Sequence, residues 1–492
     1  MKTKRPIHKK QERTRKQRKR RTKTIGGDLN PDIKNIVSRL IQDRENNKGK
    51  MLNVACKNPD NCLALGVYGP IIKQYFDNFR NLSLANAANM KRIGNKSANG
   101  FIVEIPFTKN GFTAYTILKC SAKRTSDNLF YEYYVGKFFI NSYLNIFPCF
   151  VETYDSYTFN DETSWSKLKD LTSTNNIDLT NMITRKQVPE KRTYDNNYAS
   201  EDNDLFGLSC SENKRICVLI QHFDNFRSVG DEYDDSYGNI VYDILNILYQ
   251  VYFPLTCLRM TYTHYDLHAN NVFLYKPYEG KKYIQMRYHL RSGSIIEFPS
   301  EYIVKIIDYG RNFFDNGLTN TKKILNDYIG NNTPCNPDYG RKFGYGVIQG
   351  NEYDPNVDFH WIFPNKKNMS HDLRLAVFFY DYLKQLNIFN KFFYGNTEIS
   401  DMTPSNSYSQ SNSYSQTSGK QFDHSGTPEK SGGDAKTINN IVNLRFCIEA
   451  NINNWNKNNM KKKYNSTWKK VAVMDIYEDK RPYTYRVLPD TA

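Results

Sequence analysis

The chain has 492 residues, of which 39% are hydrophobic and 14% aromatic, and a formal net charge of +17. This aromatic content excludes global disorder, because disordered chains are poor in aromatic residues, and the length suits a two-lobed domain of about 300 residues with extensions. Apolar runs stay short of the roughly 18 residues of a membrane-spanning helix, and the nine cysteines form no Cys-x-x-Cys pair. We therefore expect no transmembrane segment and an intracellular location, cytoplasmic or nuclear, with reduced thiols.

The first predicted segment is a basic arm over residues 1–27. Residues 1–24 contain 13 Lys or Arg and one acidic residue, Glu12, so they carry +12 (13 − 1) of the total charge. Like charges at this density repel one another and predict disorder. We expect the arm to contact nucleic acid or another polyanion by neutralising phosphates, and the alternative is a solubilising or packaging tail.

A helical extension is expected over residues 28–87, followed by a small, β-rich lobe over 88–222. In that lobe, residues 101–105 and 115–119 have the composition of strands, with a turn signal at 109–111 between them.

The same lobe is expected to contain one important helix, which begins at Ser126 and runs to about Tyr143. The polar stretch 156–213 is interpreted as an insertion into the lobe. Residues 215–222 then return to an apolar strand pattern.

A mainly helical large lobe is expected over residues 223–400, with a long buried helix from about Tyr237 to Thr261. The stretch between Tyr275 and Tyr302 suggests an inserted hairpin. Residues 401–435 repeat Asn-Ser-Tyr-Ser-Gln and predict a low-complexity linker, and a C-terminal helical segment is expected over 436–492.

The chemistry-bearing segment follows the long helix and reads His264-Tyr265-Asp266-Leu267-His268-Ala269-Asn270-Asn271. An acid is followed here by an amide five residues later, and a loop can direct both at one point. Asp266 is suited to orient an attacking hydroxyl group or accept its proton, and Asn271 to hold a metal bound to phosphates. His264 and His268 have the spacing of zinc ligands on a helix, but no third ligand is evident, so we expect His264 to bond the loop backbone.

A second polar group ends the apolar strand 302–307 and reads Asp308-Tyr309-Gly310. A carboxylate in this position suits Mg²⁺, which prefers oxygen ligands and keeps substrate phosphates in its shell. Gly310 lets the chain turn sharply away from the metal.

Together these segments resemble the catalytic loop and metal-binding triplet of the protein-kinase-like superfamily, whose patterns are H-R-D-L-x-x-x-N and D-F-G. The resemblance implies an α+β fold with two lobes, a small antiparallel β lobe and a mainly helical large lobe, that binds ATP and Mg²⁺. It also implies that Asp266 is the catalytic acid, Asn271 the second metal ligand and Asp308 the main metal ligand.

Other parts of the family pattern follow in order. Lys119 resembles the strand lysine that binds the α- and β-phosphates, and Glu132 the helix glutamate that pairs with it. Asp372 resembles the residue that braces the catalytic loop. The remaining implied nucleotide contacts are Gly94 and Gly100, in a degenerate phosphate-covering loop, and Gln221 and Phe223, at the adenine-binding hinge. Taken alone, Lys119 would be an ordinary strand-end lysine and the two glycines simple turn residues.

The resemblance implies an ATP- and Mg²⁺-dependent kinase that transfers phosphate to a protein Ser/Thr hydroxyl. Tyr265 and His268 depart from the protein-kinase pattern and look more like small-molecule phosphotransferases of the aminoglycoside and choline kinase type. No Ala-Pro-Glu lies between Asp308 and Asp372. The alternatives are a small-molecule acceptor and a catalytically weak scaffold, tethered by its basic arm to nucleic acid or a virion component. The composition resembles kinase-like proteins of large DNA viruses, which implies a viral, possible virion-associated protein.

Overall fold

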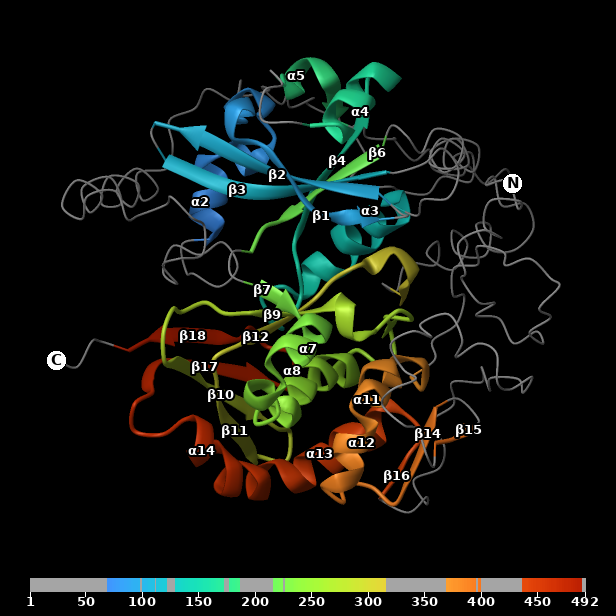
Figure 1. Cartoon of the computed structure of the whole chain (residues 1–492), viewed down its shortest axis with the longest axis vertical. Helices are drawn as coiled ribbons and strands as arrows, with labels where there is room; N and C mark the ends of the chain where they lie inside the picture. The colour runs from blue at the N-terminus through green and yellow to red at the C-terminus, as the bar shows by residue number, and fades with distance from the viewer. Residues whose placement is uncertain are drawn as a thin grey trace, which may run out of the picture. The chain divides into compact units, whose positions relative to one another are not determined.

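The computed structural model describes residues 69–97, 100–110, 112–121, 129–171, 177–185, 216–223, 226–315, 369–394, 397–399 and 436–488. All of these belong to one compact unit, Gly49–Ala492, that mixes helices with mainly antiparallel sheets (Figure 1). The α+β class is therefore confirmed. The predicted arm 1–27, most of the predicted extension 28–87 and the predicted linker 401–435 lie outside the described residues. Within the described ranges, no helix is long and apolar enough to cross a membrane.

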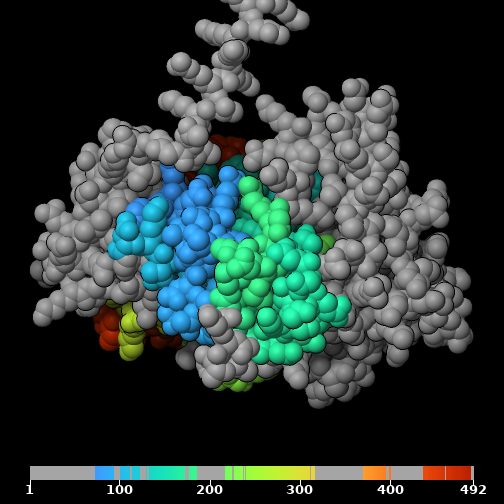
Figure 2. Space-filling model, turned by 90° about the horizontal axis from the view of Figure 1, so that it is seen from above, coloured from blue at the N-terminus to red at the C-terminus, as the bar shows by residue number. Residues whose placement is uncertain are grey.

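A six-stranded antiparallel sheet forms the first part of the structure. Its strands, in spatial order, are β1 (Lys91–Ser97), β2 (Gly100–Lys109), β3 (Phe112–Ser121), β6 (Ile216–Gln221), β4 (Thr153–Phe159) and β5 (Ile183–Arg185). β2 and β3 form the hairpin predicted around 109–111, and Asn110 in its turn has φ 49°, a region that Asn tolerates. In Figure 2, the residues coloured blue to green, from this sheet and its helices, form one continuous surface.

The polar stretch 156–213 contributes to this sheet. Its first residues complete β4, and the helix α4 (Glu162–Lys169) follows, with Asp161 as its N-cap. After α5 (Leu179–Met182), β5 pairs with β4 and forms the edge of the sheet. Part of the predicted insertion is therefore regular structure.

One helix, α3 (Leu129–Phe138), lies against β4 and β6. It is shorter than the predicted helix, because a 3₁₀ turn over Ile140–Tyr143 follows it. A Cβ atom on Gly136 would lie 2.1 Å from Thr153 Oγ1, so this glycine lets the helix approach the sheet closely. The close approach places the first turn of α3 beside β3. A further short helix, α2 (Gly69–Tyr75), precedes the sheet.

The predicted long helix is two helices, α7 (Val229–Ile240) and α8 (Ile244–Cys257). α8 is apolar on all sides, and every residue from Ile244 to Thr256 is buried, as expected for a core helix. The chain turns between the helices at Asp243, whose carboxylate is fully buried and bonded to Lys463 and Tyr464. Periodicity did not predict the break between α7 and α8. At this break Asp243 contacts two residues that lie 220 and 221 positions further along the chain.

Small sheets surround α8. β7 (Phe226–Ser228), β9 (Val272–Tyr275) and β12 (Ile303–Ile306) form one, and β8 (Tyr262–Thr263) pairs with β13 (Phe313–Phe314). Between β9 and β12, the strands β10 (Lys282–His289) and β11 (Ile295–Ser300) form an antiparallel hairpin, which confirms the predicted insertion. The remaining elements are α11 (Arg374–Phe378), α12 (Tyr380–Gln385), β14 (Lys391–Tyr394), β15 (Thr397–Glu398) and β16 (Thr437–Ile438).

The C-terminal part was expected to be helical. α13 (Ile441–Trp455), a π-helical turn (Asn456–Met460) and α14 (Lys461–Lys463) agree with that expectation. The prediction is wrong for β17 (Lys469–Tyr477) and β18 (Thr484–Val487), because β17 pairs in parallel with β10 and buries Val471–Met474. In Figure 1 these red strands lie beside the olive strands β10 and β11.

Candidate active site

The side chain of Lys119 connects groups that are far apart in the sequence. Its Nζ lies 2.5 Å from Glu132 Oε2 and 2.9 Å from Asp308 Oδ1. Lys119 comes from β3, Glu132 from the first turn of α3, and Asp308 directly follows the strand segment that contains β12. Burial by itself would lower the pKa of Lys119, but the two carboxylates outweigh this effect and raise the pKa, so the lysine is charged. The contact with Asp308 was not predicted from the sequence.

Glu132 is almost completely buried, with 5% of its surface exposed. Burial raises its pKa to about 7, against the attraction of Lys119. With all three groups ionised, one lysine and two carboxylates carry a formal charge of −1. This net negative charge favours the binding of a cation at this position.

The backbone of Asp308 adopts a left-handed conformation, with φ 67° and ψ 70°. For a residue other than glycine this costs of order 1–3 kcal/mol and tends to occur at functional sites. The next residue, Tyr309, fixes the turn: its hydroxyl accepts from Val151 N at 2.8 Å and lies 2.9 Å from Ile306 O. The carboxylate direction of Asp308 is thus set by a buried tyrosine on its own turn.

The loop that contains Asp266 is held by hydrogen bonds from its backbone to the side chain of Asp372. The two carboxylate oxygens of Asp372 accept hydrogen bonds from His264 N and Tyr265 N, each at 2.8 Å, which confirms the predicted bracing role. Burial raises the pKa of Asp372 to about 7, although these two bonds oppose the shift. They also support Tyr265 in a left-handed conformation, with φ 63°.

His264 is completely buried, and its Nε2 lies 3.0 Å from the carbonyl oxygen of Ile307. Burial lowers its pKa to about 4, so the ring is neutral at physiological pH. The prediction of a packed, backbone-bonding histidine is confirmed. The contact ties the loop to the residue immediately before Asp308.

Asn271 and Asp308 lie at the ends of neighbouring strands. Val272 pairs with Ile306 in the β9–β12 ladder, and Ile307 N donates to Asn271 O at 3.0 Å. The side-chain amide of Asn271 donates to Asp266 O at 2.9 Å, which fixes the orientation of its Oδ1. The loop therefore holds Asp266 and Asn271 as one unit beside Asp308.

The chemistry of these donors fits Mg²⁺. Asp308 and Asn271, which lie in different segments of the chain, supply hard oxygen ligands. Among the described residues, no group of three or more His, Cys, Asp or Glu could hold a metal by itself. A magnesium ion at Asp308 and Asn271 would therefore depend on phosphate oxygens of a nucleotide, which is how Mg²⁺ is usually held.

The two glycines that were predicted to contact nucleotide phosphates belong to the strands β1 and β2. Gly94 lies within β1, and β2 begins at Gly100, which pairs with Ser97; the turn residues 98 and 99 lie outside the described residues. The expected loop over 94–100 is therefore a strand followed by a short connection.

At the predicted hinge, both side chains point into the protein. Gln221 Oε1 accepts from Glu152 N at 3.2 Å, and Phe223 packs against Tyr275 under the ammonium group of Lys305. Both side chains are therefore engaged in contacts inside the protein.

Sequence reasoning missed one side chain that contacts Asp266. Arg374 Nη1 lies 2.8 Å from Asp266 Oδ1, and His268 Nε2 lies 3.8 Å from the same oxygen. Arg374 follows Asp372 by two residues. The predicted role of Asp372 was therefore the only feature of the sequence that could have indicated a role for Arg374. Compared with known proteins, the chain matches no family model and no curated protein.

Proposed function

We propose that this protein is an ATP- and Mg²⁺-dependent phosphotransferase of the protein-kinase-like superfamily, acting on a protein Ser/Thr hydroxyl group. The observation that carries the proposal is the position of Lys119 Nζ, within 2.9 Å of both Glu132 and Asp308 although Asp308 is 189 residues away. A lysine held by two carboxylates in this way is prepared to bind phosphate, and Asp308 to bind the accompanying metal.

The arrangement of elements supports a fold with two lobes. The six-stranded sheet and α3 provide Lys119 and Glu132, and the part that contains α8 and the smaller sheets provides Asp266, Asn271 and Asp308. The two sets meet in the contact between Lys119 and Asp308.

The proposed roles follow from these positions. Lys119 binds the α- and β-phosphates, and Asp308 and Asn271 hold the metal. When bound, Mg-ATP supplies the phosphoryl group and an electrophilic phosphorus. Asp266 orients the acceptor hydroxyl and takes its proton. Rate enhancement then comes from positioning and charge neutralisation, without a covalent intermediate on the protein.

ATP consumption tests the proposal. Wild type is compared with Asp308→Ala and Lys119→Ala, and with Lys167→Ala on α4 as a control for loss of an exposed lysine. Both site variants should lose turnover by about two orders of magnitude or more, and the control should retain it. If wild type binds Mg-ATP but consumes it no faster than Asp308→Ala, the enzyme proposal fails and the catalytically weak scaffold replaces it.

The acceptor is tested separately, with labelled ATP offered to a protein mixture and to a set of small alcohols. Label in protein Ser/Thr supports the protein-kinase proposal, and label only in small molecules supports the alternative phosphotransferase. An intracellular location and polyanion binding by residues 1–27 belong to the same proposal.

A further inference from the structure

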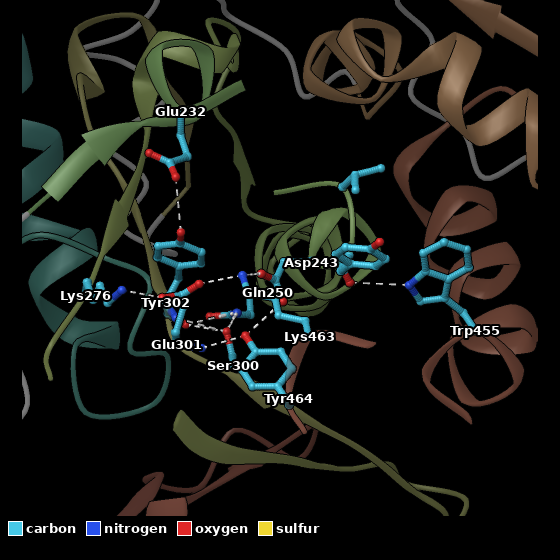
Figure 3. Close-up of polar contacts among 12 residues, drawn as sticks. Glu232, Asp243, Gln250, Lys276, Ser300, Glu301, Tyr302, Trp455, Lys463 and Tyr464 are labelled. Carbon is cyan, nitrogen blue, oxygen red and sulfur yellow. Dashed lines mark hydrogen bonds and ion pairs between the residues drawn. The ribbon is translucent and has the colours of Figure 1, made fainter. Parts of the chain in front are cut away.

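The short helix α14 has one lysine that points into the protein. The ammonium group of Lys463 contacts Asp243 and lies 2.5 Å from Glu301 Oε1, and only 8% of the side chain is exposed. Next to it, the Tyr464 hydroxyl donates to Asp243 Oδ1 at 2.9 Å and accepts from Glu301 N at 3.0 Å. Figure 3 shows these groups converging at the N-terminal end of α8. The C-terminal segment is therefore fixed to the core at this point.

The sequence around this anchor is strongly basic. From Ala450 to Met474 there is no Asp or Glu, and there are six lysines, at positions 457, 461, 462, 463, 469 and 470. Lys463 is the anchor, and the other five are exposed. The exposed asparagines Asn458 and Asn465 lie in the same segment. The anchor thus holds a segment that carries exposed lysines and contains no acidic residue.

Pairing between β10 and β17 adds two more lysines to this surface. Lys282 is the register partner of Lys469, and Lys470 is the partner of Tyr283. Lys281 donates from Nζ to Thr467 Oγ1 at 3.3 Å, and its carbonyl accepts from Lys469 N at 2.9 Å. Both Lys281 and Lys282 are exposed. We call the seven exposed lysines 281, 282, 457, 461, 462, 469 and 470 the lysine face.

We propose that the lysine face binds the phosphate backbone of a nucleic acid. The seven exposed lysines come from two segments, distant in the sequence, that the β10–β17 pairing brings together. In the sequence that leads into these two strands, residues 276–281 and 464–468, Glu279 is the one acidic residue. Placing like charges close together is unfavourable. When lysines neutralise a phosphate backbone, counterions are released from the nucleic acid, and this release favours binding. Amide side chains such as Asn458 and Asn465 add donors of the kind that contact phosphates.

A lipid surface fits the same region less well. Binding to a membrane interface normally inserts large apolar side chains beside the basic ones. Among the described residues, the large hydrophobic side chains that are exposed are Met260, Ile295 and Phe446, and none of them belongs to the loop and strand segments that carry the lysine face. The observations therefore favour nucleic acid, and the lysine face shares no residue with the candidate active site or with residues 1–27.

The test uses the full chain and a fluorescein-labelled DNA duplex of about 20 base pairs, with binding measured by polarisation over a range of salt concentrations. The face variant changes Lys461, Lys462, Lys469 and Lys470 to Gln. The control changes Lys167, Lys384, Lys391 and Lys436 to Gln; these are also exposed and give the same change in net charge. The face variant should weaken binding at least tenfold and reduce the slope of log affinity against log salt by about 3 to 4, because each phosphate contact contributes about 0.9.

Equal effects in the two variants, or an unchanged slope in the face variant, would overturn the proposal and leave general electrostatics or the arm as the contact. It is also overturned if the face variant loses binding to anionic phospholipid vesicles while DNA binding is unchanged. Thermal melting checks folding. If the fourfold variant melts early, the Lys461→Gln, Lys462→Gln double variant replaces it, with an expected slope change of about 2.

Discussion

The guanidinium group of Arg374 donates a hydrogen bond to Oδ1 of Asp266 at 2.8 Å, across 108 residues of sequence. Asp266 is the side chain proposed to orient the acceptor hydroxyl, so Arg374 fixes the direction of a carboxylate whose function is directional. Arg374 lies at the start of α11, directly after the 3₁₀ turn that contains Asp372. One short segment therefore positions both the loop backbone and its acidic side chain.

Arg374→Ala should lower kcat for ATP consumption by about 10²-fold, because a misplaced reacting group can cost that much. The KM for ATP should change little, since the arginine contacts no residue of the proposed phosphate site. Arg374→Lys should restore part of kcat, because it keeps a cation near Asp266. Steady-state kinetics measure both parameters. Arg259→Ala, a change at an exposed arginine, is the control, and a normal kcat in Arg374→Ala would show that the contact does not position Asp266.

Asp372→Ala should destabilise the protein and abolish activity. The buried N–H groups of His264 and Tyr265 would lose their acceptors, at about 1–3 kcal/mol each, so the free energy of unfolding should fall by about 2–6 kcal/mol. Asp372→Asn keeps one acceptor oxygen and should lose less. Urea unfolding measures the difference. If both variants are as stable as wild type, the bracing interpretation is wrong.

Lys305 should make stability depend on pH in the alkaline range. It is 1% exposed, its Nζ donates to Pro148 O at 2.6 Å, and burial lowers its pKa from 10.5 to about 8. Between these two values the native state binds fewer protons than the unfolded state, so wild-type stability should rise with pH relative to Lys305→Met, by about 3 kcal/mol in total. Urea unfolding of both proteins across this interval measures the difference, and a pH-independent difference would mean that burial does not lower the pKa of Lys305 below its unfolded value.

Lys463→Met should be strongly destabilising, because it leaves the carboxylates of Asp243 and Glu301 buried without their shared cation. Breaking a buried ion pair from one side typically costs about 3–5 kcal/mol. Lys462→Met, at the exposed neighbouring position, should stay within about 0.5 kcal/mol of wild type. Thermal and urea unfolding measure both variants. Equal stability of the two would argue that the anchor contributes nothing.

Several local features could be predicted from the sequence because their causes are local. The hairpin β10–β11 followed from the length of chain between two strands, and the packed, backbone-bonding His264 from its position in a loop with no third metal ligand. The α+β class was implied by the resemblance of the two polar segments to the protein-kinase-like superfamily. The order of Asp266, Asn271 and Asp308 placed them on a loop and a strand end, which is where the structure has them.

The rest depended on contacts over long sequence separations. No spacing rule connects Arg374 with Asp266, or Lys463 with Asp243, which are 220 residues apart. The break before α8 coincides with that second contact, which periodicity cannot detect, so the sequence pattern joined two helices into one. Gln221 was expected to face a nucleotide by its position, but the backbone N–H of Glu152 competes for its side-chain oxygen. Strand β17 was missed because its partner β10 lies in another part of the sequence.

The parallel pairing of β10 with β17 also has a consequence for how the protein is made. β17 begins 187 residues after β10 (469 − 282), so a ribosome working at about 5–20 residues per second needs roughly 10 to 40 seconds to deliver the partner strand. During that interval one edge of β10 is open to other nascent chains. Completion of this sheet must therefore wait until β17 has been translated, and a message cut short before β17 should yield a polypeptide that depends on chaperones to stay out of aggregates.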